Sequence, residues 1–178
     1  MNTTSVTILL VLFLAALLPA CGDPKPTAPA PQGLALQSGE RPFGGFGISA
    51  GQPSEERLQE IAPHMACVLS FRMPGENPYD QAALTTAAGG RFVQIGFDKA
   101  GLMDPAKRQL AYDAFESAMQ DPERMTYFHC GSGNRVAALW ACYRCEVEKK
   151  SVEDAIADGK AAGLTKLEPV VREILSGK

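Results

Sequence analysis

The hydrophobic residues of this chain fall into short apolar runs and longer stretches with helical spacing. Three apolar runs, at residues 67–71, 92–95 and 125–128, precede loops rich in glycine, proline or charge, which is typical of buried strands. Helical spacing between and after these runs predicts helices. They begin near Ser54, Tyr79, Asp104, Arg135, Ser151 and Thr165, the last with the spacing of a capping box. Strands that alternate with helices, followed by further helices, predict an α/β fold with a small, mainly parallel sheet flanked by helices.

The first 20 residues have the pattern of an export signal. Residues 6–18 form a nearly continuous apolar run of 13 residues, which is short for a membrane span and typical of a signal-peptide core. The run ends in the sequence LPAC, which resembles a bacterial lipobox with Cys21 as the lipidated residue. An ordinary cleaved signal peptide is the alternative. Residues 1–5 lack the lysine or arginine that is expected at the start of such a signal.

These patterns predict a signal peptide of the lipoprotein type at 1–20, a tether at 21–47 and a globular domain at 48–178. Residues 22–40 contain four prolines and little hydrophobic periodicity, as an extended linker does. We therefore expect a protein of the bacterial cell envelope that faces the periplasm and is anchored to the membrane through lipid on Cys21.

Composition narrows the possible partners. Hydrophobic residues make up 46% of the chain and charged residues 21%, which indicates a globular protein, and a net charge of −3 gives no support for a nucleic-acid partner. Five cysteines are an odd number and do not suggest a disulfide framework. Cys142 and Cys145 lie on one face of a predicted helix, where they are a structural thiol pair or, alternatively, a disulfide or redox partner for Cys130. With two histidines and no second cysteine pair, we expect no metal and no cofactor.

The densest group of reactive residues follows the third predicted strand. The loop after His129 consists of Cys130, Gly131, Ser132, Gly133, Asn134 and Arg135. Backbone N–H groups of such a loop and of the helix that follows converge on one point, where the helix dipole adds positive charge. This environment stabilises a thiolate, and the arginine can hold an oxyanion with two hydrogen bonds. The pattern favours an anion-binding site over a buried structural cysteine beside a turn.

Other polar residues follow the first two strands. The carboxyl ends of parallel strands meet at one edge of a sheet, so we expect Asp98 and the loop that begins at Arg72 to lie near Cys130. Arg72 and Glu76 either line this site or pair with each other.

Four motifs in this order resemble those of dual-specificity-phosphatase-like proteins, especially the bacterial beta-lactamase-hydrolase-like phosphatases. They are GQPS at 51–54, VLSFR at 68–72 with Glu76, FVQI at 92–95 and HCGSGNR at 129–135. The resemblance covers about residues 48–176 and implies a cysteine-dependent phosphoester hydrolase. It makes Cys130 the nucleophile and Arg135 the phosphate clamp, with the amides of residues 131–135 as the cradle. His129 would tune the thiolate, and Asp98 would be the general acid.

Two features depart from the phosphatase pattern. Phosphatases of this superfamily have five residues between the cysteine and the arginine, whereas this chain has four, and Val136 replaces the usual Ser or Thr. The shorter loop resembles that of rhodanese-type sulfurtransferases, which carry a persulfide on the cysteine. Three hypotheses follow: a phosphatase-like hydrolase acting on a phosphorylated substrate, a sulfurtransferase acting on a sulfur donor, and a non-catalytic lipoprotein that binds anions.

Overall fold

The computed structural model of the chain describes residues 33–121 and 123–176. The predicted signal peptide, Cys21 and most of the predicted tether lie outside these residues. Within the described part, no helix is long and apolar enough to cross a bilayer.

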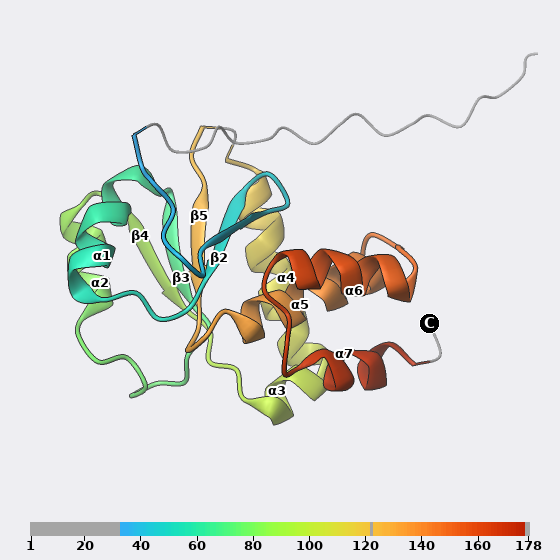
Figure 1. Cartoon of the computed structure of the whole chain (residues 1–178). Coiled ribbons are helices and arrows are strands. Elements are labelled where there is room, and N and C mark those ends of the chain that lie inside the picture. Colours follow the sequence, from blue (N-terminus) through green and yellow to red (C-terminus); the bar gives the residue numbers. More distant parts are fainter. Residues whose placement is uncertain (1–32, 122, 177–178) are drawn as a thin grey trace, which may run out of the picture.

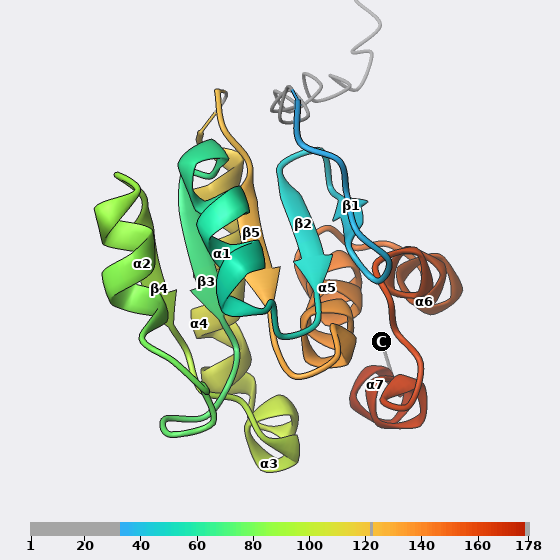
Figure 2. The same ribbon diagram turned by 60° about the vertical axis from the view of Figure 1, so that its left-hand side comes forward.

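In the described residues, five strands form one sheet in the order β1-β2-β5-β3-β4 (Figure 1). The strands are β1 (Arg41–Phe43), β2 (Gly47–Ala50), β3 (Cys67–Ser70), β4 (Arg91–Gln94) and β5 (Thr126–His129). β1 is antiparallel to β2, and every other pair is parallel, which confirms the predicted α/β class. The parallel strands therefore end at one edge, towards which their arrows point in Figure 2.

Strands β1 and β2 were not predicted from the sequence. Residues 41–47, assigned to the tether, belong instead to the domain, because Phe43 and Phe46 are buried against Phe128 and Trp140. Gly47, at the start of β2, is needed for close packing of this segment. A Cβ on Gly47 would lie 2.8 Å from the Phe43 ring and 2.9 Å from the Phe128 ring, so this position has no room for a side chain.

Helices cover both faces of the sheet (Figures 1 and 2). The face that carries Ile48, Val68 and Tyr127 packs against α1 and α2, and α4 and α5 pack on the opposite face. Helices α6 and α7 pack against α5. The bounds are α1 (Glu55–Ile61), the 3₁₀ turn η1 (Ala62–His64), α2 (Gln81–Ala87), α3 (Lys99–Met103), α4 (Pro105–Met119), α5 (Asn134–Glu146), α6 (Val152–Ala161) and α7 (Glu168–Leu175). Ser54, Asp104 and Ser151 cap their helices as predicted.

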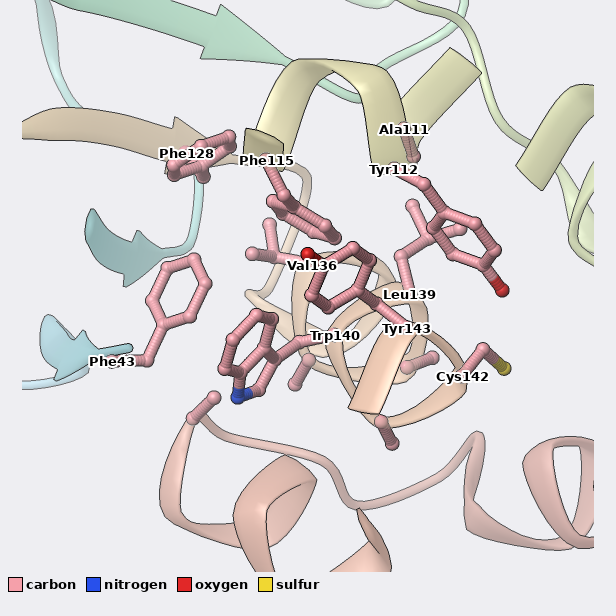
Figure 3. Close-up of a cluster of buried hydrophobic side chains, with 14 of the residues drawn as sticks. Phe43, Ala111, Tyr112, Phe115, Phe128, Val136, Leu139, Trp140, Cys142 and Tyr143 are labelled. Atoms are coloured by element: carbon pink, nitrogen blue, oxygen red, sulfur yellow. The ribbon is translucent and has the colours of Figure 1, made fainter. Parts of the chain in front are cut away.

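The larger core lies between the sheet, α4 and α5 (Figure 3). Phe115 of α4 makes aromatic contacts with Phe128 of β5 at 5.2 Å and with Trp140 of α5 at 5.6 Å between ring centroids. Aromatic rings bury a large apolar area each, so this cluster is a main source of the stability of the fold. It fixes α5 against the end of β5, and the loop between these two elements holds Cys130.

Candidate active site

The loop from Cys130 to Gly133 joins β5 to α5 at the carboxyl edge of the sheet. The end of the neighbouring strand β2 holds it in place: the Cys130 amide donates to the Ala50 carbonyl at 3.3 Å, and the Gln52 amide donates to the Gly131 carbonyl at 3.3 Å. Gly51 and Ser132 form a further isolated bridge. The loop is thus fixed by backbone contacts before any ligand binds.

Gly133 is the N-cap of α5 and has φ +80°, in the left-handed region that favours glycine. An added Cβ would lie 3.4 Å from the Ala50 carbonyl carbon, against the backbone that holds the loop. Helix α5 spans 13 residues, and its first amides have no partner within the helix. A helix N-terminus of this kind favours an anion, and the anion-binding site at this loop stays a prediction that this geometry supports.

The Arg135 side chain extends from the first turn of α5 to the loops that follow β3 and β4. Its Nη1 donates to the carbonyls of Phe71 at 3.1 Å and Phe97 at 2.6 Å, and its Nη2 donates to Glu76 at 3.1 Å. The guanidinium is therefore fixed from three sides, while 23% of the side chain remains exposed. A guanidinium held in this way is preorganised to bind an oxyanion.

Glu76 connects this arginine to the loop after β3. It pairs with Arg135 and, at 3.7 Å, with Arg72, so both alternatives raised by the sequence apply. Arg72 also donates to Gln52 at 3.1 Å. Burial opposes ionisation of Glu76, but hydrogen bonds from the Met73 amide and from Arg135 outweigh it and hold the pKa of Glu76 below its usual value. The carboxylate thus balances the charge of Arg135.

His129 lies directly before Cys130 and is fully buried. Its Nε2 is 3.0 Å from Gln81 Oε1 of α2. Burial lowers the pKa of His129 to about 4, so the imidazole is neutral at neutral pH. Any influence of His129 on Cys130 therefore comes from position and hydrogen bonding, not from a positive charge.

Asp98 is the N-cap of α3, a short helix that the sequence did not predict, and its carboxylate accepts from the Gly101 amide at 2.7 Å. This hydrogen bond holds the pKa of Asp98 below its usual value. A general acid must carry a proton before it can donate one, so Asp98 can fill that role only in the fraction of molecules in which it is protonated.

A cavity of about 370 Å³ brings most of the predicted site together. It is lined by Gly131, Ser132, Asn134 and Arg135 and by Asp98 from the loop after β4. Cys130, with 1% of its surface exposed, is buried directly after β5, and neither Cys130 nor His129 nor Gly133 is among the residues that line the cavity. Lys99 and Lys166 also line the cavity, and sequence reasoning missed both, because no local motif marks either residue.

The side chain of Asn134 contacts the connection between α6 and α7. Its Nδ2 donates to Thr165 Oγ1 at 2.7 Å, and its Oδ1 accepts from the amides of Thr165 at 3.2 Å and Leu167 at 3.3 Å. The predicted capping box at Thr165 and Glu168 is wrong: Leu167 is the N-cap of α7, without a side-chain cap. The Thr165 hydroxyl instead accepts a bond from the loop, across 31 positions of sequence.

Several solved structures share this arrangement of elements, among them one described as a putative phosphatase from Neisseria meningitidis, with a TM-score of 0.58 and 19% identity over 75% of this chain and 94% of that one. The Siw14 catalytic core matches with a TM-score of 0.63 and 13% identity, over 82% of this chain and 87% of that one. Tk-PTP in its active form matches with a TM-score of 0.62 and 15% identity, over 79% of this chain and 95% of that one. P. aeruginosa TpbA in complex with pTyr matches with a TM-score of 0.57 and 17% identity, over 74% and 79%. The chain has the fold of protein-tyrosine-phosphatase-like phosphatases.

At these identities the likeness concerns the phosphatase-like fold and leaves the activity to be tested. No protein-family model and no curated protein matches the sequence. The roles of Cys130, Arg135, Asp98 and His129 therefore stay predictions, which rest on the geometry described above.

The remaining cysteines of the described phosphatase-like domain, Cys67, Cys142 and Cys145, are buried free thiols. Burial raises the pKa of Cys142 to about 12, which makes it a poor nucleophile. Cys142 lies eight positions after Asn134 in α5, about 12 Å along the helix axis, so a direct bridge to Cys130 needs movement of the backbone. The pair agrees with the interpretation as structural thiols. Within the described residues, no cluster of His, Cys, Asp and Glu side chains is suited to hold a metal ion.

Proposed function

We propose that this domain is a cysteine-dependent hydrolase of phosphate monoesters, with Cys130 as nucleophile and Arg135 as oxyanion clamp. The observation that carries the proposal is the preorganised guanidinium of Arg135, which is held by Phe71, Phe97 and Glu76 beside a loop with converging amides. Its support from outside the chain is the phosphatase-like fold.

In the first step, the Cys130 thiolate attacks phosphorus and an S–P bond forms as the bond to the leaving oxygen breaks. Arg135 and the loop amides bind the equatorial oxygens, where negative charge develops. Protonated Asp98 gives its proton to the leaving oxygen, which departs as an alcohol or phenol.

In the second step, water attacks the phosphocysteine. The Asp98 carboxylate accepts a proton from this water, the S–P bond breaks, and inorganic phosphate and the Cys130 thiolate are released. The first step needs Asp98 in its protonated form, and the second step needs it as the carboxylate. Because its resting state is the carboxylate, we expect the first step to be the one that acid conditions favour.

The proposed location of the domain follows from the predicted lipid modification of Cys21. A lipid-modified Cys21 would anchor the domain to a bacterial membrane on the periplasmic side, so the substrate would be a phosphorylated molecule outside the cytoplasm. A phosphorylated substrate is also supported by the complex of the structurally similar TpbA with pTyr.

The test is hydrolysis of p-nitrophenyl phosphate by the purified protein. We expect turnover that is abolished by Cys130→Ser and unchanged within about two-fold by Cys67→Ser, which alters a buried thiol outside the cavity. Retained turnover in Cys130→Ser would overturn the proposed mechanism.

The four-residue loop supports a second candidate, a sulfurtransferase, because a smaller cradle suits one sulfur atom. Incubation with thiosulfate should then leave a persulfide on Cys130, detectable by mass spectrometry, and sulfur should pass to cyanide. If both assays are silent while phosphate or sulfate still binds, the domain is a non-catalytic anion-binding protein.

A further inference from the structure

Two lysines on the cavity have no ion-pair or hydrogen-bond partner within residues 33–121 and 123–176. Lys99 opens α3 and Lys166 lies between α6 and α7, and both side chains line the cavity that holds Arg135. Three other lysines of the described residues have partners: Lys149 donates to the Glu146 carbonyl, Lys150 pairs with Asp158 and Lys160 with Glu168, whereas Lys107 forms no ion pair. The cavity thus has two lysine side chains that form no ion pair with the carboxylates of Glu76 and Asp98, which line it as well.

Lys166 is held at the cavity by the loop itself. The hydrogen bonds of Asn134 to Thr165 and Leu167 are on both sides of Lys166, so the backbone that carries this lysine is tied to the residue before Arg135. Asn134 is 7% exposed, and a buried amide with these bonds is costly to move. The position of Lys166 relative to the cradle is therefore fixed.

Lys99 is held by a separate support. Asp98 caps the first turn of α3, and buried Arg108 donates to the carbonyls of Leu102 at 2.9 Å and Met103 at 3.1 Å at its last turn. Arg108 is itself fixed by Glu146 of α5 at 2.9 Å. Both ends of α3 are therefore anchored, and Lys99 stays at the rim of the cavity.

The charges at the site indicate what these lysines are for. Glu76 offsets one cationic charge through its contacts with Arg135 and Arg72, and the Asp98 carboxylate adds a second negative charge to the lining. The loop amides and Arg135 serve the phosphate that reacts. Lys99 and Lys166, which pair with neither carboxylate, are therefore available to a second anionic group. The volume of about 370 Å³ suits a small organic molecule.

We infer that this cavity selects phosphate monoesters that carry a second anionic group, a phosphate or a carboxylate, bound by Lys99 and Lys166. The inference rests on the proposed hydrolase function and adds the substrate class. Exposed charge pairs contribute modestly, so the two lysines together should give a preference of roughly ten-fold in kcat/KM, which salt should reduce.

The test compares phenyl phosphate with 3-carboxyphenyl phosphate and 1,3-phenylene bisphosphate, with release of inorganic phosphate as the readout. We expect kcat/KM roughly ten-fold higher for the two anionic probes at low salt, beyond the factor of two that the second phosphate adds statistically. Lys166→Gln and Lys99→Gln should each lower this ratio by about three-fold, and the double variant should bring it towards one. Arg124→Gln, which removes a positive charge at the opposite edge of the sheet, is the matched control and should keep the ratio.

Binding of the same three compounds to Cys130→Ser, measured by calorimetry, separates the two claims. If wild-type protein hydrolyses all three equally and the lysine variants change no ratio, the substrate class is wrong and the hydrolase stands. If nothing is hydrolysed but Cys130→Ser binds the anionic probes more tightly in a lysine-dependent way, the hydrolase fails and the second anion site stands. A preference that survives the double variant overturns the assignment to these lysines.

Discussion

The two edges of the sheet each combine a cavity, a buried cysteine and an arginine, yet they differ in chemistry. The carboxyl edge holds the cavity of about 370 Å³ at the loop that follows Cys130. The amino edge has a larger cavity, of about 470 Å³, lined by Arg91 and Arg124 among others, with Cys67 nearby at the start of β3. Neither the volume nor the presence of a thiol separates a candidate active site from an ordinary surface depression.

The difference lies in the backbone around each cysteine. Cys67 is paired with Arg91 of β4 and with Thr126 of β5, inside the sheet ladders, and burial raises the pKa of its thiol. Cys130 follows the last paired residue of β5, so the chain leaves the ladder and its next amides turn towards the start of α5. The carboxyl edge therefore combines the loop after Cys130 with the N-terminus of α5, whose first amides have no partner within the helix, as expected at this end of parallel strands.

The largest expected effect tests the arginines of the two edges. Arg135→Lys keeps the charge but loses the planar fork that Phe71, Phe97 and Glu76 orient. We expect kcat for p-nitrophenyl phosphate to fall by about 10² to 10³, as on loss of an oxyanion donor. Arg124→Lys at the amino edge should change kcat by less than about two-fold. Equal losses at both positions would show that the comparison of the edges is wrong.

The next effect concerns two aspartates that both accept backbone N–H bonds. Asp98 caps α3 at the carboxyl edge, and Asp121 accepts from the amides of Glu123 and Arg124 at the amino edge. Because the pKa of Asp98 is held below its usual value, kcat for phenyl phosphate should rise as pH falls and this acid becomes protonated. Asp98→Asn should lower kcat by about 10² and remove this limb of the pH profile, whereas Asp121→Asn should keep it. If kcat still rises as pH falls in Asp98→Asn, the general acid is another group.

The sequence was sufficient to predict elements that rest on local patterns. The runs predicted at 67–71, 92–95 and 125–128 correspond to β3, β4 and β5, and Asp104 and Ser151 start their helices because a cap and its partner lie within one turn. The convergence of Asp98 and of the loop that begins at Arg72, through Glu76, on the edge that holds the loop after Cys130 also followed, since strand polarity alone determines it.

What the sequence did not show depends on contacts between distant residues. Strands β1 and β2 are three and four residues long, and only packing on Trp140 and Phe128 makes a glycine-rich segment part of the sheet. Lys166 is at the cavity because Asn134 binds its neighbours from 31 positions away. No short pattern encodes such a contact, so the second anion site was invisible until the fold was known.

A stability effect of intermediate size separates the two histidines. Burial lowers the pKa of His129 to about 4, whereas the unfolded chain binds this proton near the usual value. The folded state therefore gains stability that is present above about pH 6.5 and lost as pH falls towards 4, about 3 kcal/mol in total. Between pH 6.5 and 4, the loss seen by urea unfolding should be about 3 kcal/mol larger in wild-type protein and in His64→Gln, which alters an exposed histidine, than in His129→Gln, where only the carboxylates still contribute. The same loss in His129→Gln would contradict the buried neutral imidazole.

The smallest effect is expected for two glycines that share the same left-handed backbone conformation. Gly133 at the loop and Gly89 before β4 both have φ +80°, so alanine at either should lower the free energy of unfolding by about 1–2 kcal/mol. Their surroundings differ: a Cβ on Gly89 meets nothing within 4 Å, whereas one on Gly133 lies 3.4 Å from the Ala50 carbonyl carbon. Since the Ala50 carbonyl also accepts the Cys130 amide, Gly133→Ala should shift the loop and lower kcat about ten-fold, while Gly89→Ala should leave kcat unchanged. Thermal unfolding and phosphatase assays on the same samples measure both. If Gly133→Ala and Gly89→Ala lose the same activity, general destabilisation of the fold, and not the position of the loop against β2, lowers kcat.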